Sequence, residues 1–140
     1  MTEKTLEKAN MPIEEIIQII CAKLPTVQAI YLFGSVNTAF ANAVSDVDLA
    51  VLAEKKIDNG ITWQLAQEIA KLLKKDVDLI DLWQASTVMR REIINTGSRL
   101  FCKNAVWCDE FENTALSTYL RFNEERREIL EDIQKRGSIF

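Results

Sequence analysis

The sequence predicts a single domain of the α/β (α+β) class, in which a small mixed β-sheet is flanked by helices and a long helix ends the chain. Apolar runs at 27–33, 46–52 and 76–82 have the length and composition of buried strands. Segments with apolar residues every three or four positions alternate with these runs, which is typical of helices that pack on a sheet. The 140 residues are enough for one domain with its own hydrophobic core.

The first ten residues are polar, and we expect the first helix to run from Pro12 to Leu24. Proline suits the first turn of a helix, and Pro25 ends this one because it disfavours helical geometry in the residue before it. The helix carries one apolar stripe: Ile13, Ile16, Ile17, Ile20 and Leu24. The strand at 27–33 follows, and a short helix is expected at about 36–41.

A charged turn, AEKKIDNG, separates the second strand from a helix expected over 61–74. The inward residues of that helix are predicted to be Ile61, Leu65, Ile69, Leu72 and Leu73. The third strand follows at 76–82. Ser86 can cap a further helix through about Asn95, and Gly97 suits its end. A short strand at 99–102 is expected to join the sheet.

The last segment, about 107–136, is interpreted as one long helix, or two. An apolar stripe runs along it: Phe111, Ala115, Tyr119, Phe122, Ile129 and Ile133. At 1.5 Å per residue the helix would be about 45 Å long, whereas a domain of this size has a radius of gyration of about 14 Å. Either the far part of the stripe contacts another protein, or the helix bends back over the sheet.

Residues 34–48, GSVNTAFANAVSDVD, carry polar side chains suited to phosphate and metal chemistry. Gly34 lets the backbone approach a ligand closely, and a helix that begins at Ser35 would point free N–H groups at an anion. Asp46 and Asp48 are one residue apart, so both carboxylates lie on one face of the second strand. Two carboxylates this close repel unless a cation lies between them. Oxygen ligands without imidazole or thiolate favour Mg²⁺ or Mn²⁺, which carboxylates and substrate phosphates hold jointly.

The third strand offers further carboxylates. If it lies beside the second strand, about 4.8 Å separates the two backbones, and Asp78 can complete a triad with the aspartates of the second strand. Asp76 shares the face of Asp78 and is the second choice, whereas Asp81 lies on the opposite face. Asp76 and Asp81 are interpreted as solvated charges at the sheet edge. Three arginines are candidate contacts for phosphate or a partner, although each alone is interpreted as a solvated charge: Arg90, Arg91 and Arg99.

The composition excludes several classes of protein. The chain has no histidine, which excludes a Cys/His zinc site and a Ser-His-Asp hydrolase. A net charge of −4 argues against direct, stable nucleic-acid binding through a broad basic face. Cys21, Cys102 and Cys108 show no paired spacing and are interpreted as reduced thiols. We expect no signal peptide and no membrane span, and therefore a cytoplasmic protein.

Gly34-Ser35 and Asp46-x-Asp48 stand at one fixed spacing between two hydrophobic strands. At residue frequencies of roughly 5–7 % each, a chance match in the chain is on the order of one in a thousand, so we treat the arrangement as a motif. It resembles the signature of the polymerase-β-type nucleotidyltransferase superfamily. The compact form, over about 12–103, resembles the minimal nucleotidyltransferase (MNT) domain, which in many bacteria and archaea is the antitoxin of a HEPN-domain ribonuclease toxin. Many relatives have an arginine where this chain has Thr38; that charge is missing here, but the expected metal ligands are intact.

The resemblance implies Mg²⁺- or Mn²⁺-dependent transfer of AMP from ATP to a tyrosine hydroxyl of the HEPN toxin, which blocks its ribonuclease activity. Gly34 and Ser35 would anchor the phosphates, and Asp46 and Asp48 would hold the metal. The family carries a third acidic residue on the third strand. The match falls best on Asp78, which would help to bind a second ion and draw the proton from the attacking hydroxyl.

Two alternatives remain at this point. The chain could be an antitoxin that neutralises by binding alone, with a vestigial site, which the threonine at position 38 favours and the retained motif opposes. It could also be a small-molecule transferase of the aminoglycoside type. That class requires a second domain to form the acceptor pocket, and this chain is short for one.

Overall fold

Four strands form one mixed sheet in a computed structural model that describes residues 11–34 and 46–135. The strands are β1 (Val27–Phe33), β2 (Val47–Ala53), β3 (Val77–Asp81) and β4 (Ser98–Cys102). Their order in the sheet is β3-β2-β1-β4. The central strand β1 pairs antiparallel with β2 and β4, whereas β2 and β3 run parallel. The predicted α/β (α+β) class with a mixed sheet is thus confirmed.

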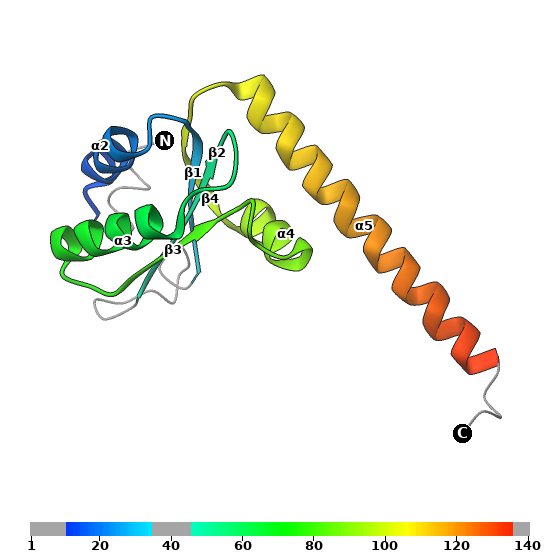
Figure 1. Ribbon diagram of the computed structural model, residues 1–140. Coiled ribbons are helices and arrows are strands. Elements are labelled where there is room, and N and C mark those ends of the chain that lie inside the picture. Colours follow the sequence, from blue (N-terminus) through cyan, green and yellow to red (C-terminus); the bar gives the residue numbers. More distant parts are fainter. Residues whose placement is uncertain (1–10, 35–45, 136–140) are drawn as a thin grey trace.

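Helices cover both faces of this sheet (Figure 1). One face packs against α2 (Ile13–Lys23) and α3 (Asn59–Leu73). The other face packs against α4 (Thr87–Thr96) and the first turns of α5 (Ala105–Lys135). Neither α5 nor any other helix in the described part of the chain is long and apolar enough to span a membrane.

The two central strands are apolar on both sides because helices lie above and below them. All seven residues of β1 are buried, and in β2 only Asp48 is not fully buried. Successive residues of β1 enter opposite layers: Ile30 and Leu32 pack towards α2 and α3, whereas Ala29 and Tyr31 pack towards α4 and α5. This burial on both faces anchors the strands whose ends carry the motif.

The expected elements agree with the observed ones to within about two residues, which is the usual uncertainty of helix ends. Ser86 caps α4, since its hydroxyl accepts a hydrogen bond from the Met89 N–H at 3.1 Å. Gly97 is the residue that ends the same helix. All three cysteines are free thiols. The short helix expected at 36–41 lies outside the described residues.

The interpretation of Asp81 as a solvated charge at the sheet edge is wrong. Its side chain is buried and accepts hydrogen bonds from the backbone N–H groups of Ile57 and Trp83 and from Nε2 of Gln84, at 2.8, 3.0 and 3.0 Å. The loop after β2 and the turn after β3 need an acceptor for these donors, and Asp81 supplies it. An aspartate that bonds the N–H two residues ahead is a common turn pattern, so the sequence did contain this signal.

The last helix, α5, is a single helix of 31 residues that leaves the sheet after its first turns (Figure 1). Cys108, Phe111 and Ala115 are its buried residues. The following apolar side chains are exposed: Leu120, Phe122, Ile129, Leu130 and Ile133. The alternative in which the helix bends back over the sheet is therefore wrong. No glycine or proline interrupts 105–135, so nothing in the sequence provides a kink.

A polar network fixes the base of α5 to the sheet. The Tyr31 hydroxyl of β1 donates a 2.6 Å hydrogen bond to Oε2 of Glu112. Arg99 of β4 forms ion pairs with Glu112 at 2.9 Å and with Asp109 at 3.2 Å. Burial, together with the bonded carboxylate, raises the pKa of Tyr31 well above its usual value. The phenol therefore stays neutral and acts as a donor.

Replacing Glu112 with alanine is expected to lower the free energy of unfolding by about 1–3 kcal/mol, because a buried hydroxyl loses its charged partner. Chemical denaturation measures this difference. Glu110→Ala, on the exposed side of the same helix, is the matched control and should change stability by less than about 0.5 kcal/mol. Equal losses in the two variants would show that the network contributes nothing of its own.

Candidate active site

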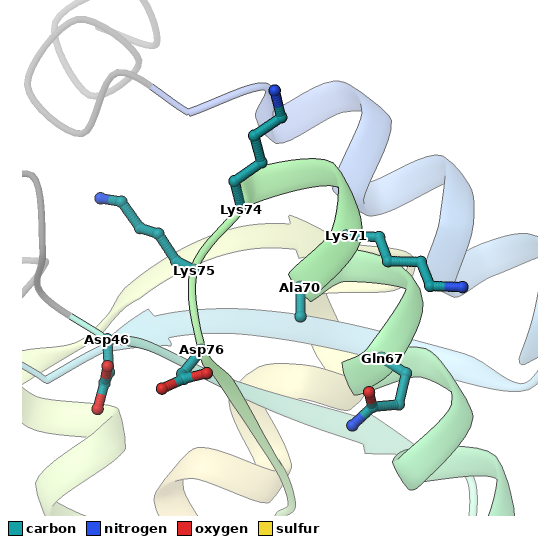
Figure 2. A pocket seen from close by; sticks show the side chains of 7 residues that line it. All are labelled: Asp46, Gln67, Ala70, Lys71, Lys74, Lys75 and Asp76. Carbon is teal, nitrogen blue, oxygen red and sulfur yellow. The ribbon is translucent and has the colours of Figure 1, made fainter.

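The three candidate metal ligands, Asp46, Asp48 and Asp78, lie at the starts of the neighbouring strands β2 and β3, at the same end of the sheet. The parallel register pairs the Cα atoms of Asp48 and Asp78, so their side chains lie side by side on one face. That face is the one that α4 and α5 cover further along the strands. Asp46 precedes β2 and lies beside Asp76, which precedes β3 (Figure 2). The structure thus brings together the carboxylates that the sequence places on separate strands.

The three aspartates differ in exposure. Asp48 is partly buried, whereas Asp46 and Asp78 are exposed. Burial raises the pKa of Asp48, and the negative charges of Asp78 and Asp46 raise it further. Within the described residues, no ion pair offsets these three carboxylates. The site therefore has excess negative charge, which a cation would relieve.

Gly34 ends β1 directly beside this group, because its neighbour Phe33 pairs with Asp48 in the β1–β2 ladder. Its φ is +80°, in the left-handed region that glycine adopts without strain. A Cβ at this position would collide with the carboxylate of Asp48. Glycine is therefore needed both for the backbone turn and for the space that the carboxylate occupies. Ser35 and Thr38 lie outside the described residues.

The donor set fits a hard divalent cation. Carboxylate oxygens are the preferred ligands of Mg²⁺ and Mn²⁺. Burial and the neighbouring charges of Asp78 and Asp46 raise the pKa of Asp48, and a bound cation would oppose this effect. Among the described residues, no three ligating side chains already converge on one point. Asp46, Asp48 and Asp78 could thus hold an ion only by drawing together, with substrate phosphates completing its ligands.

A hollow of about 530 Å³ opens next to Asp46, between the sheet edge and the end of α3 (Figure 2). We call it the lysine hollow after three of its lining residues. The lining consists of Asp46, Gln67, Ala70, Lys71, Lys74, Lys75 and Asp76. Sequence analysis did not single out these lysines. The available signal was the run KLLKK at 71–75, which ends two residues before the third strand.

The three candidate arginines each contact other residues of the domain. Arg90 donates from Nε to the Leu82 carbonyl and from Nη2 to the Trp83 carbonyl, both at 2.7 Å. Arg99 is engaged in the network at the base of α5. The Arg91 guanidinium lies 5.1 Å from the centre of the Tyr119 ring. These arginines position α4 and α5. The interpretation as a solvated charge is wrong for Arg90, whereas Arg99 is exposed and forms its ion pairs at the surface.

Comparison with known proteins identifies related sequences. Residues 14–106 match the family model described as "Polymerase beta, Nucleotidyltransferase". The protein adenylyltransferase MntA of Shewanella oneidensis (strain MR-1) is 38% identical over 120 residues, which are 85% of this chain and 85% of the relative.

Solved structures of other proteins have the same fold as this chain. A chain in a toxin–antitoxin complex with AMP-PNP superposes with a TM-score of 0.78 at 35% identity, over 89% of this chain and 99% of that chain. A chain in a complex of tri-AMPylated Shewanella oneidensis HEPN toxin with MNT antitoxin gives a TM-score of 0.74 at 34% identity, over 90% of this chain and 98% of that chain. At such coverage, the similarity extends beyond 14–106 into α5.

Asp48→Asn is expected to raise the thermal midpoint of the metal-free protein at neutral pH. Because the folded state raises the pKa of Asp48, its ionised form costs stability. The contribution of this group is fully present below its unfolded pKa and is lost as the pH rises through the raised folded pKa. The advantage of the variant should therefore grow from acid to neutral pH, as thermal denaturation in a chelating buffer would measure.

Glu110→Gln provides the control, since its side chain is exposed on α5, away from the site. Adding Mg²⁺ should raise the midpoint of the wild type by mass action and have a smaller effect on Asp48→Asn. A variant that is less stable than the wild type at neutral pH would contradict the electrostatic account of this site.

Proposed function

This chain belongs to the polymerase-β-type nucleotidyltransferase family, and on that premise we propose that it is an adenylyltransferase antitoxin. It transfers AMP from ATP to a tyrosine hydroxyl of a partner HEPN ribonuclease toxin in the cytoplasm and thereby neutralises the toxin. The observation that carries this proposal is the register that places Asp48 beside Asp78, with Gly34 at the adjoining strand end. Two similarities support a HEPN toxin as the acceptor. The MntA relative is a protein adenylyltransferase, and a structurally similar MNT antitoxin is in complex with a tri-AMPylated HEPN toxin.

The site binds the donor through its glycine turn and its carboxylates. Gly34 turns the backbone at the end of β1 and leaves room for the Asp48 carboxylate, and the hydroxyl of Ser35 is the proposed donor to the phosphates. Asp46 and Asp48 would hold the divalent cation that accompanies the triphosphate. When bound there, Mg²⁺ supplies charge neutralisation on the phosphates and lowers the pKa of the attacking hydroxyl.

Transfer proceeds by in-line displacement at the α-phosphorus. The acceptor oxygen forms a new bond to that phosphorus, the bond to the bridging oxygen of the β-phosphate breaks, and pyrophosphate leaves. Asp78 is the proposed acceptor of the hydroxyl proton. Because its side chain is exposed, it can pass that proton on to solvent, and no histidine is needed for this step.

A protein acceptor suits the open form of this site. Asp46, Asp76 and Asp78 are exposed, and the described residues that line the lysine hollow beside them come from the starts of β2 and β3 and the end of α3. A small-molecule transferase would have to enclose its acceptor with further elements. A docked protein instead brings its own surface, so a minimal domain is sufficient.

The uncovered half of α5 is the proposed contact surface for that protein. Its apolar residues continue the stripe that buries Cys108, Phe111 and Ala115 against the domain. Beyond that point the stripe faces solvent: Phe122 is 39% exposed, Ile129 60% and Ile133 42%. A helix with one apolar stripe is a common element of protein–protein recognition.

The first test combines Asp46→Ala with Asp48→Ala. We expect AMP transfer to fall by about a thousandfold or more, because the triphosphate loses its cation and its orientation. Purified partner toxin is incubated with ATP, Mg²⁺ and either protein, and its intact mass is followed for steps of one AMP.

The matched control is Glu14→Ala with Glu15→Ala, which removes two exposed carboxylates from α2 on the opposite face of the sheet. This variant should transfer AMP at the wild-type rate. If the wild type forms a stable complex and neutralises the toxin without any gain in mass, the chain is a binding-only antitoxin.

A second test addresses α5. Ile129→Asp with Ile133→Asp is expected to weaken toxin binding roughly 10- to 100-fold, because apolar interface residues lose burial and a charge is placed in their contact. Isothermal titration calorimetry with the toxin measures this change. Glu124→Ala with Glu131→Ala, on the opposite side of the helix, should bind as the wild type does, and equal affinity of both double variants would remove α5 from the interface.

A further inference from the structure

The lysine hollow concentrates positive charge beside the carboxylates. Lys71 lies in the last turn of α3, Lys74 is its C-cap, and Lys75 begins the connection to β3. Within the described residues, none of the three forms an ion pair. In Figure 2 their ammonium groups point in three different directions, and their flexible four-carbon stems must turn for all three to contact one anion.

Lys74 occupies a position that favours glycine. Its φ is 56°, the left-handed conformation in which many helices end, usually with glycine because a Cβ is strained there. The backbone N–H of Lys74 donates to the Ala70 carbonyl at 2.8 Å, so the turn itself needs no side chain. A lysine here accepts backbone strain and adds a charge to the hollow, which points to a role for the side chain.

The strand order fixes where this charge lies relative to the reaction. Along the sheet edge come Gly34 at the end of β1, Asp48 at the start of β2, and Asp78 near the start of β3. The donor phosphates belong at the glycine side. The lysine hollow lies at the other side, next to Asp76 and the end of α3. The hollow opens on the α3 side of the sheet, whereas Asp48 and Asp78 lie on the side that α4 and α5 cover, and Asp46 and Asp76 are the carboxylates that line the hollow. An acceptor that reaches around the β3 end of the sheet therefore meets both the carboxylates and the lysines.

We propose that the lysine hollow binds the phosphate of an AMP group already attached to the acceptor, and so promotes the next addition. This inference rests on the proposed function. The toxin in a related complex is tri-AMPylated, so an acceptor of this kind presents anionic AMP groups after its first modification. A phosphodiester carries one negative charge, and three lysines provide charge-assisted donors for it.

The second transfer follows the same chemistry as the first. A hydroxyl of the modified acceptor attacks the α-phosphorus of a new ATP and forms one oxygen–phosphorus bond. The bond from the α-phosphorus to the bridging oxygen breaks, pyrophosphate leaves, and the hydroxyl proton passes to the carboxylate of Asp78. The lysines take no part in these bonds; they hold the earlier phosphate while the hydroxyl reaches the donor.

The test compares unmodified toxin with toxin carrying one AMP, prepared with limiting ATP and purified. The variant combines Lys71→Gln, Lys74→Gly and Lys75→Gln; glycine at position 74 suits the left-handed turn, so the fold is preserved. We expect the first addition within about twofold of the wild-type rate. The second addition should slow about tenfold, with a raised KM for the modified toxin, because a charged contact is lost.

Lys55→Gln with Lys56→Gln is the control for the loss of exposed positive charge away from the hollow, since these exposed lysines follow β2 at the opposite end of that strand. It should leave both additions unchanged. The proposal is overturned if the lysine-hollow variant slows both additions equally, which would indicate docking of the unmodified toxin, or if it slows neither. A wild type that stops at one AMP overturns it as well, whereas a wild type that adds none refutes the proposed function itself.

Fragmentation mass spectrometry separates two sources of the bound phosphate. The second AMP is attached either to the first AMP or to a neighbouring side chain of the toxin. In both cases, a phosphate held in the hollow requires that the additions occur in a fixed order. Additions in random order at separate residues would overturn the inference.

Discussion

The pairing of β2 with β3 is the constraint on which the site depends. Its register places Asp48 opposite Asp78, although two neighbouring carboxylates repel each other. The apolar residues that follow in both strands supply the compensating free energy, because Val51 and Leu52 of β2 are fully buried between the helix layers. A shift by one residue would turn the carboxylates into the α2–α3 layer and the aliphatic residues out of it. The core thus determines the position of the charges.

A second group of contacts, in the layer of α4 and α5, sets the direction of α5. Trp83, Trp107 and Phe111 meet edge to face or stacked, with ring centres 5.0–6.5 Å apart. Arg90 packs over two of these rings while its guanidinium satisfies backbone carbonyls after β3. Together with the Tyr31–Glu112 hydrogen bond, these contacts hold only the first turns of the helix. The remaining turns project from a rigid base.

Most of the fold could be predicted from sequence because its signals are local. The run at 27–33 is buried throughout, and Ser86 and Gly97 mark the ends of α4 as their chemistry suggests. The sequence also predicted that Asp48 and Asp78 lie close together, because each stands near the start of a strand and the two strands were expected to be neighbours. The lysine hollow was missed because it depends on how the end of α3 lies against the edge of the sheet, and Arg90 was misread because its partners are backbone carbonyls that no sequence pattern reveals.

Within residues 11–34 and 46–135, the apolar side chains of the free half of α5 are exposed and do not belong to the hydrophobic core of the sheet that carries the carboxylates. Substitutions at these exposed positions are therefore expected to change the stability of the domain little. In the proposed function, recognition by α5 and catalysis at the sheet are thereby separated within one short chain. A lineage of such proteins can change its partner by altering one helix face, while the sheet and its reaction stay the same.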